Sequence, residues 1–310
     1  MLPLALRRER HGPGRSASVA DKPAAEVAVD AGLVRRLLAA QHPDLADLPL
    51  RLVASGWDNV IYRLGDDIAV RLPRRAAAAG LIEHEQRWLP VLAPRLPVAV
   101  PAPVRRGVPG HGYPWAWTVT RWMAGTTAAE APPGERRALA EPLAAFVTAL
   151  HRPAPADAPL NPVRGVPLPT RHDAVVGRLT GGLVPQAERA AALWAELSAT
   201  PAWAGPALWL HGDLHPANLV VADGALAAVL DFGDLTAGDP ATDLAAAWLT
   251  FDAAGRERFV RALGDAYDAA TWRRARGWAL ALATALIAHS DDAPVLRAVG
   301  DHALREVLAG

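Results

Sequence analysis

Four polar side chains of different chemistry lie close together in the stretch 209–233. They are the imidazole of His211, the carboxylates of Asp213 and Asp231, and the carboxamide of Asn218. Carboxylate and amide oxygens suit hard cations such as Mg²⁺, which leave other coordination positions for water and phosphate. Asp213, on the loop that leads to Asn218, would lie beside a cation held by Asn218 and Asp231. The pattern indicates a base next to a metal clamp.

A hairpin must position these groups. Two short apolar runs, 219–222 and 225–230, are joined by an Asp-Gly dipeptide, which is well suited to a two-residue type I′ turn. An unbroken ladder around this turn places Asn218 opposite Val229. Because side chains alternate between the faces of a hairpin, Asn218 and Asp231 would then share one face at a diagonal separation of roughly 7–8 Å.

The composition is typical of a protein with a large core. The chain has 310 residues and 51% hydrophobic composition, enough for two lobes around a cleft. Its formal net charge is zero, so no global basic field would attract nucleic acid or an anionic membrane. The sequence contains no cysteine, which excludes disulfides, thiolate catalysis and Cys-ligated zinc, and a cytoplasmic location is the default expectation.

The first residues lack the pattern of a secretory signal, because their short apolar opening is broken by Pro3 and followed by Arg7 and Arg8. We expect residues 1–25 to form a disordered tail. The longest apolar candidate, 278–288, falls short of the roughly 20 residues of a membrane span and is predicted to be a buried core helix. Neither nucleic acid nor a membrane is expected as a partner, and the sequence carries no signal of an oligomeric state.

Residues 26–124 are predicted to form a lobe rich in β-structure. Asp30 can cap a helix that ends near Gln41 and has an apolar face. The spacing of apolar runs and turns then predicts an antiparallel meander, a second helix, Pro-rich turns through Pro114 and one more strand. These elements fall at 50–54, 60–64, 68–72, 76–92 and 115–123.

Residues 125–310 are predicted to form a mostly helical lobe, entered at Gly125. Helices are expected at 136–151 and 184–200, with a Pro-rich connection at 152–170 that is partly loop. Further helices are expected to begin near Pro240, Arg256, Thr271 and Asp292. The fold class is therefore α+β, with an antiparallel-sheet N-terminal lobe and a helical C-terminal lobe.

Several ordered motifs resemble the aminoglycoside phosphotransferase-like family, small-molecule kinases related to the protein kinases. The family's catalytic loop and metal-binding triplet are similar to His211-x-Asp213-(x)4-Asn218 and Asp231-Phe232-Gly233. The runs 56–65, 70–74, 85–89 and 238–243 match other family motifs in the correct order. The resemblance extends from about residue 30 to the end of the chain and implies the two-lobed protein-kinase-like fold.

This resemblance implies transfer of the γ-phosphoryl group of ATP or GTP, with Mg²⁺, to a hydroxyl of a small molecule, either an aminoglycoside-type antibiotic or another hydroxylated metabolite. Asp213 would be the catalytic base, and Asn218 and Asp231 the Mg²⁺ ligands. Arg71 falls on the position of the cation that holds the α- and β-phosphates. Glu85 falls on the position of the acid that pairs with this cation.

The resemblance also implies supporting roles. Gly56 and Asn59 belong to the loop that would cover the phosphates through backbone N–H groups. Trp122 lies at the expected adenine-side junction, where its backbone rather than its ring would meet the base. Asp243 would brace the catalytic loop.

Two alternatives remain open. The chain could be a catalytically weak, nucleotide-binding pseudokinase. It could also be a metallohydrolase that uses His211, Asp213 and His215, since imidazole and carboxylate suit zinc or iron. The nearest other histidines, His151 and His172, show no recognisable ligand spacing.

The acceptor-side segment 152–206 carries a mixed charge that argues against a strongly anionic pocket. Its charged residues are Asp157, Asp173, Glu188, Glu196, Arg152, Arg164, Arg171, Arg178 and Arg189. Acids outside this segment, namely Asp234, Asp291, Asp292 and Glu306, can still supply negative charge. Aminoglycosides, macrolides, sugars and amino alcohols all remain candidate acceptors.

Overall fold

The structure is a computed structural model that describes residues 24–310. The tail expected at residues 1–25 lies outside the described residues except for its last two positions. In the described part of the chain, no helix is long and apolar enough to cross a membrane.

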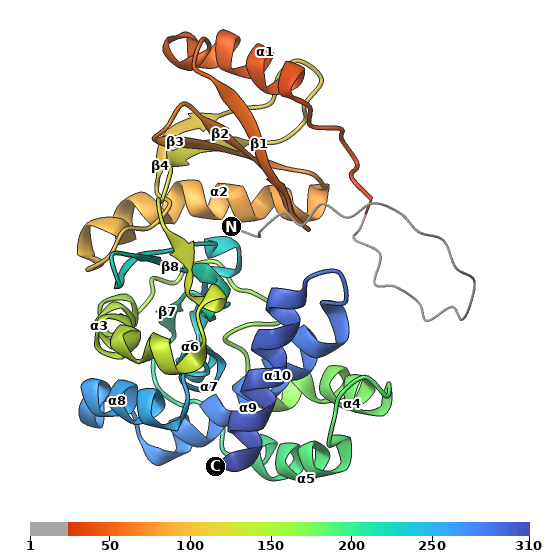
Figure 1. Cartoon of the computed structure of the whole chain (residues 1–310), viewed down its shortest axis with the longest axis vertical. Coiled ribbons are helices and arrows are strands. Elements are labelled where there is room, and N and C mark those ends of the chain that lie inside the picture. The colour runs from red at the N-terminus through yellow and green to blue at the C-terminus, as the bar shows by residue number, and fades with distance from the viewer. Residues whose placement is uncertain (1–23) are drawn as a thin grey trace.

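Strands outnumber helices in the first half of the chain, and helices dominate the second (Figure 1). The strands are β1 (Leu50–Ser55), β2 (Asn59–Leu64), β3 (Ile68–Pro73), β4 (Pro103–Gly107), β5 (Trp117–Arg121), β6 (Thr126–Thr127), β7 (Leu208–Leu210), β8 (Leu219–Ala222), β9 (Ala225–Val229) and β10 (Thr236–Gly238). The helices are α1 (Ala31–Gln41), α2 (Ala76–Leu92), α3 (Ala140–Leu150), α4 (His172–Thr180), α5 (Ala187–Ser198), α6 (Ala241–Leu244), α7 (Ala246–Thr250), α8 (Ala253–Leu263), α9 (Ala269–His289) and α10 (Pro294–Ala309).

The N-terminal lobe is an antiparallel five-stranded sheet in the order β1-β2-β3-β5-β4. Side chains alternate along β2, where Val60, Tyr62 and Leu64 are buried in one core with the apolar face of α1. Asp30 caps α1 as predicted, because its Oδ1 accepts a hydrogen bond of 2.7 Å from the backbone N–H of Leu33. Helix α2 lies on the other side of the sheet, toward the helical lobe (Figure 1). The predicted two-lobed α+β fold is confirmed.

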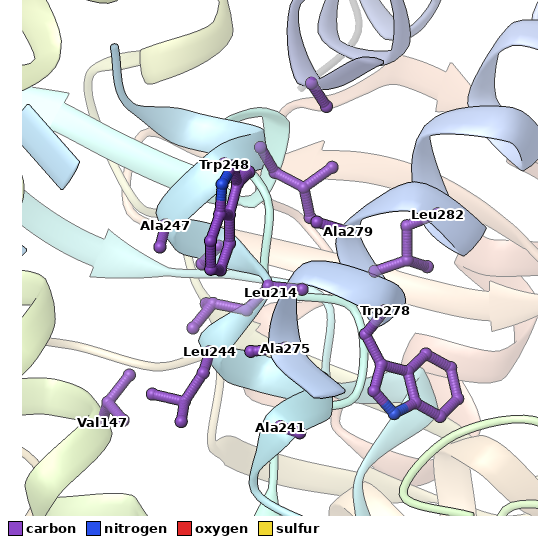
Figure 2. Close-up of a cluster of buried hydrophobic side chains, with 14 of the residues drawn as sticks. Val147, Leu214, Ala241, Leu244, Ala247, Trp248, Ala275, Trp278, Ala279 and Leu282 are labelled. Atoms are coloured by element: carbon purple, nitrogen blue, oxygen red, sulfur yellow. The ribbon is translucent and has the colours of Figure 1, made fainter. Parts of the chain in front are cut away.

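The C-terminal lobe is built around α9, which was predicted as a buried core helix. Side chains from α6, α7 and α9 meet Leu214 of the loop between β7 and β8 (Figure 2). Many of these residues are alanines, and small side chains let helix backbones approach closely. At Gly277 of α9 even a methyl group has no room, since an added Cβ would lie 2.3 Å from Leu168 Cδ2. The same core thus packs the helices and supports the loop with the polar residues.

Strand β4 lies where Pro-rich turns were predicted, and that prediction is wrong. The strand begins at Pro103 and exposes Arg105 and Arg106. It forms an edge of the sheet, where a proline without an N–H and charged side chains are tolerated. An edge strand therefore lacks the apolar alternation by which a central strand is predicted.

Two helical features also differ from the prediction. Helix α4 was not predicted, because its nine residues include only a short apolar pattern, with Val175 and Leu179 buried. The helix predicted at 136–151 begins as a 3₁₀ turn over Pro133–Leu139 and becomes α-helical only in α3. Both differences concern short, proline-flanked segments whose conformation depends on the surrounding lobe.

The hairpin of β8 and β9 closes at the predicted Asp-Gly dipeptide, since the residues on either side of it pair with each other. Its ladder contains a β-bulge at Ala227, however, so Leu219 pairs with Val229. The prediction that Asn218 lies opposite Val229 is wrong by one residue. An extra residue in one strand shifts every later pair and exchanges the faces to which side chains point.

Gly107 in the unpredicted strand β4 provides a test of the sheet packing. An added Cβ would lie 1.9 Å from Cε2 of the buried Trp117, so Gly107→Ala should lower the free energy of unfolding by roughly 1–3 kcal/mol. Gly80→Ala in α2 is the matched control, because nothing lies within 4 Å of its added Cβ. This control should be stabilising by about 0.5–1 kcal/mol, as alanine favours a helix interior. Urea unfolding measures the change in the free energy of unfolding for both variants. Equal changes would contradict the close packing of Gly107 on Trp117.

Candidate active site

A cleft lies between the sheet of the N-terminal lobe and the β8–β9 hairpin. Its upper wall comes from β1, β2 and β3, and its lower wall from the hairpin, with the crossing segment 120–127 at the back. The walls are apolar at Ala54, Ile61, Ala69, Val220 and Leu230. Two apolar surfaces that face each other can hold a flat aromatic group between them.

Arg71 and Glu85 form a buried ion pair on the sheet side of the cleft. Arg71 Nη1 donates to Glu85 Oε2 at 2.6 Å, and the side chain of Glu85 is only 1% exposed. Burial raises the pKa of Glu85 to about 7, against the opposing effect of Arg71. Burial alone would lower the pKa of Arg71, but Glu85 and Asp231 outweigh this effect and raise it. Arg71 therefore presents a fixed positive charge at the cleft wall.

Asn218 and Asp231 both line the cleft, although the hairpin register differs from the prediction. The bulge places Asn218 opposite Leu230, whose N–H donates to the Asn218 carbonyl at 2.8 Å. In a regular ladder the next residue, Asp231, would point to the other face. Asp231 instead has a φ of +60°, in the left-handed region, and this conformation ends the strand. A local backbone conformation thus brings the two side chains to one wall.

The oxygen atoms of these two residues fit a divalent cation. The Asp231 carboxylate is 60% exposed, and its ion pair within residues 24–310 is with Arg71 Nη2 at 3.8 Å. Asn218 Nδ2 donates to the carbonyl of Asp213 at 2.9 Å, and no group in the described part of the chain donates to Asn218 Oδ1. An open carboxylate and an open amide oxygen are ligands that Mg²⁺ prefers.

Asp213 is held by two side chains that were not predicted as its partners. Arg164 Nη2 lies 3.2 Å from Asp213 Oδ1, and His215 Nε2 lies 3.2 Å from Oδ2. Burial alone would raise the pKa of Asp213, but His215 and Arg164 outweigh it and hold the pKa below its usual value. Asp213 is therefore an ionised, hydrogen-bonded carboxylate. Sequence reasoning weighed His215 only as a metal ligand and noted Arg164 only as one charge in a mixed segment.

Asp243 connects the catalytic loop to α6. Its two oxygens accept hydrogen bonds from the backbone N–H groups of His211 and Gly212, at 2.7 and 2.8 Å. His151 Nε2 lies 3.1 Å from Asp243 Oδ2, and His151 Nδ1 lies 2.8 Å from the hydroxyl of Tyr267. Burial would raise the pKa of Asp243, but His151 and these N–H groups lower it. The bracing contact that the resemblance implied is present, and the His151–Tyr267 extension was not foreseen.

His211 has a structural setting. Its Nε2 lies 2.8 Å from the carbonyl of Leu230, its Nδ1 accepts the N–H of Asp213, and its ring packs on Phe232 with centroids 4.6 Å apart. Within residues 24–310, no three His, Cys, Asp or Glu side chains are grouped so that they could hold a metal. This arrangement gives no support to a metallohydrolase site at His211, Asp213 and His215.

The remaining predicted residues differ in their positions. Trp122 lines the cleft, and its backbone N–H donates to the carbonyl of Asp67 at 2.7 Å. Gly56 and Asn59 do not line the cleft in this structure. The N–H of Gly56 donates to the carbonyl of Asn59 at 2.8 Å, while Asn59 Oδ1 is buried and has no hydrogen-bond partner among residues 24–310. The loop between β1 and β2 is thus held by a hydrogen bond between its own backbone groups.

Comparison with known sequences gives one family. A model described as "Phosphotransferase enzyme family" matches residues 49–278. No match was found among curated proteins.

Comparison with solved structures gives phosphotransferases. The GDP complex of aminoglycoside 2′-phosphotransferase-IIIa is 18% identical, with 89% of this chain and 98% of that chain covered and a TM-score of 0.66. Macrolide 2′-phosphotransferase MphH from Brachybacterium faecium is 22% identical, with 88% and 97% covered and a TM-score of 0.62. The streptomycin–ATP–APH(2″)-IIa ternary complex is 18% identical, with 84% and 91% covered and a TM-score of 0.58. At these identities the likeness shows a shared fold.

Asp243→Ala tests the brace. The change leaves two buried N–H groups and His151 without their acceptor, so the free energy of unfolding should fall by about 3 kcal/mol or more. The exposed Asp265→Ala is the control and should change it by less than about 0.5 kcal/mol. Since the folded pKa of Asp243 is depressed, its contribution is present above the unfolded pKa of about 3.9 and declines as the pH falls through the folded value. Urea titrations at several pH values should show the free energies of unfolding of the wild-type chain and Asp243→Ala approaching each other in acid. A difference that stays constant with pH would contradict this role of Asp243.

Proposed function

The chain belongs to the phosphotransferase enzyme family, and on that premise we propose that it transfers the γ-phosphoryl group of ATP or GTP, with Mg²⁺, to a hydroxyl of a small molecule. One observation carries the proposal. A fixed cation, Arg71, and two open oxygen ligands, on Asn218 and Asp231, line one cleft, and Asn218 Nδ2 donates to the backbone carbonyl of the ionised Asp213. Phosphoryl transfer requires charge neutralisation on one side of the phosphorus and an oriented hydroxyl on the other.

The nucleotide base is proposed to lie between the apolar walls of the cleft, against the segment that contains Trp122. One of the similar structures is a GDP complex and another an ATP complex, which supports a nucleotide in the corresponding place here. We propose residues 26–124 as the nucleotide-binding lobe and residues 125–310 as the catalytic and acceptor-binding lobe.

The phosphates are proposed to extend from the base toward Arg71 and Asp231. Arg71 has one nitrogen, Nη1, committed to Glu85, and Nη2 faces Asp231 across 3.8 Å. A guanidinium presents several N–H donors in one plane, so Arg71 can hold phosphate oxygens while Glu85 fixes its position. Mg²⁺, when bound by Asn218 Oδ1 and the Asp231 carboxylate, would neutralise negative charge on the phosphates.

Asp213 is proposed to orient the acceptor hydroxyl. Arg164 and His215 each occupy one of its oxygens, and the remaining lone pairs can accept the hydrogen bond of a hydroxyl. The hydroxyl oxygen attacks the γ-phosphorus, the bond from this phosphorus to the β–γ bridging oxygen breaks, and the proton passes to Asp213. Because the pKa of Asp213 is depressed, its main contribution is orientation, and the proton moves late, as in a loose transition state.

Removal of the proposed base or metal ligand tests this mechanism. Asp213→Ala and Asp231→Ala should each lower product formation by a factor on the order of 10²–10⁴ or more while the chain stays folded. Asn218→Ala should instead raise the Mg²⁺ concentration needed for half-maximal turnover. Asp223→Asn is the matched control, since it removes a carboxylate from the turn of the same hairpin.

The readout is nucleotide-dependent phosphorylation across a panel of hydroxyl acceptors, together with Mg²⁺-dependent nucleotide hydrolysis. Full activity of the Asp213 or Asp231 variant would refute the mechanism. Nucleotide binding by the wild-type chain without turnover of any acceptor or of water would favour the pseudokinase alternative.

Glu85→Ala tests the role of the Arg71 ion pair. Loss of its partner leaves the Arg71 side chain free to leave the cleft wall, so the KM for the nucleotide should rise about tenfold, equivalent to about 1.4 kcal/mol. Glu83→Ala is the control, because Glu83 lies two residues earlier on α2 and is exposed. Steady-state kinetics that show equal KM values for both variants would exclude Arg71 as the phosphate-binding cation.

A further inference from the structure

We propose that Arg164 occupies the place that a cationic group of an acceptor would take, so that this site accepts a hydroxyl compound without an ammonium group beside the reacting hydroxyl. The inference rests on the proposed function, because it concerns the acceptor of that reaction. It names the substrate class, and it makes Arg164 a residue that determines specificity.

The first observation is that one guanidinium bridges the carboxylates of Asp213 and Asp234. Arg164 Nη2 lies 3.2 Å from Asp213 Oδ1 and 3.5 Å from Asp234 Oδ2. The other oxygen of Asp213 faces His215, and the other oxygen of Asp234 accepts a 2.7 Å hydrogen bond from Asn161 Nδ2. All four carboxylate oxygens thus have a protein partner. Arg164 already supplies a positive charge to both carboxylates, so an ammonium group would gain a strong ion pair here only if Arg164 moved away.

The second observation is that the backbone beside Arg164 is fixed. Gly165 has a φ of +67°, its N–H donates to Thr242 Oγ1 at 3.1 Å, and its carbonyl accepts the N–H of Asp239 at 2.9 Å. Gly238 packs directly against it, since a Cβ on Gly238 would lie 2.2 Å from the carbonyl oxygen of Gly165. The loop therefore fixes the backbone of Arg164 next to Asp213. The guanidinium can leave Asp213 only if the Arg164 side chain rotates.

The third observation is the charge around this bridge. Two further arginines, Arg171 and Arg178, follow on the same segment, and the structure gives neither a carboxylate ion-pair partner within residues 24–310. Arg178 donates to Thr284 Oγ1 and to the carbonyl of Ala281 on α9. Burial lowers the pKa of Arg178 to about 10, and the positive charges of Arg171 and Arg164 act in the same direction.

Two of the four acids of the same segment form ion pairs elsewhere, and the other two, Asp173 and Glu188, are exposed. Asp157 pairs with Arg87, and Glu196 pairs with Arg273 at 3.0 Å, both at the surface. Asp234, the acid closest to Asp213, is already engaged by Arg164. A polycation would therefore meet guanidinium groups where it needs free carboxylates, and this repulsion is a form of discrimination against it.

The test compares an acceptor scaffold with and without its positive charges. The probes are kanamycin and fully N-acetylated kanamycin, and their binding to the folded chain is measured by calorimetry without nucleotide. The wild-type chain should bind kanamycin at least tenfold more weakly than Arg164→Gln does, because this variant uncovers the carboxylates of Asp213 and Asp234. Arg164→Lys retains the charge and should behave like the wild-type chain. Arg152→Gln, an exposed arginine of the same segment, is the matched control and should leave the affinity unchanged.

The affinity of the wild-type chain for N-acetylated kanamycin should equal or exceed its affinity for kanamycin. Equal kanamycin affinity in the wild-type chain and Arg164→Gln, or tight binding of kanamycin by the wild-type chain, would overturn the inference. Thermal unfolding shows whether Arg164→Gln is folded. If it is not, the inference is tested by the affinities of the wild-type chain for kanamycin and for N-acetylated kanamycin. Mg²⁺-dependent nucleotide hydrolysis is measured in parallel, so that failure of the proposed function is distinguished from failure of the acceptor class.

Discussion

The carboxylate of Asp243 is the contact on which the geometry of the site depends. It lies in the core of the helical lobe, and both of its oxygens accept backbone N–H groups of the catalytic loop, from His211 and Gly212. A buried charge is stable only when it is paired and hydrogen-bonded, and His151 supplies the remaining partner. The loop that carries Asp213 therefore cannot move without uncovering a buried carboxylate. This constraint transmits the rigidity of the helices to the site.

The alanine-rich helices explain how Asp243 reaches the loop. Helix α6 is only four residues long, and it packs against α9, whose small side chains allow close approach (Figure 2). Gly212 packs against the turn at 232–234, since an added Cβ on Gly212 would lie 2.3 Å from the carbonyl oxygen of Asp234. Short elements with small residues thus hold the catalytic loop, the hairpin and the 232–234 turn together. In the same region Arg164 bridges Asp213 and Asp234, so the acceptor-side segment becomes part of this unit.

The cleft combines two kinds of order. Its walls are apolar and come from regular strands, whereas its polar groups lie where regular structure ends, at the turn before β8 and at the left-handed Asp231. Strand ends leave side chains free to meet a ligand, while the strands keep them in place. Arg71 differs from Asn218 and Asp231, because it lies within β3, and its position depends on the buried Glu85 of α2. The N-terminal lobe thus fixes the cation, and the C-terminal lobe fixes the oxygen ligands.

The sequence by itself determined the features that depend on neighbours along the chain. The Asp30 cap of α1, the apolar face of that helix, the meander of β1 to β3 and the Asp-Gly turn follow from local propensity and periodicity, and the structure has them where they were predicted. The pairing of Arg71 with Glu85 followed from the family resemblance. Only the tertiary structure decided the rest. The bulge at Ala227 and the left-handed Asp231 set which side chains face the cleft, because backbone strain is offset by contacts from other elements. One partner of Asp213, His215, lies two residues away, but the other, Arg164, is 49 residues away, a separation at which no local pattern acts.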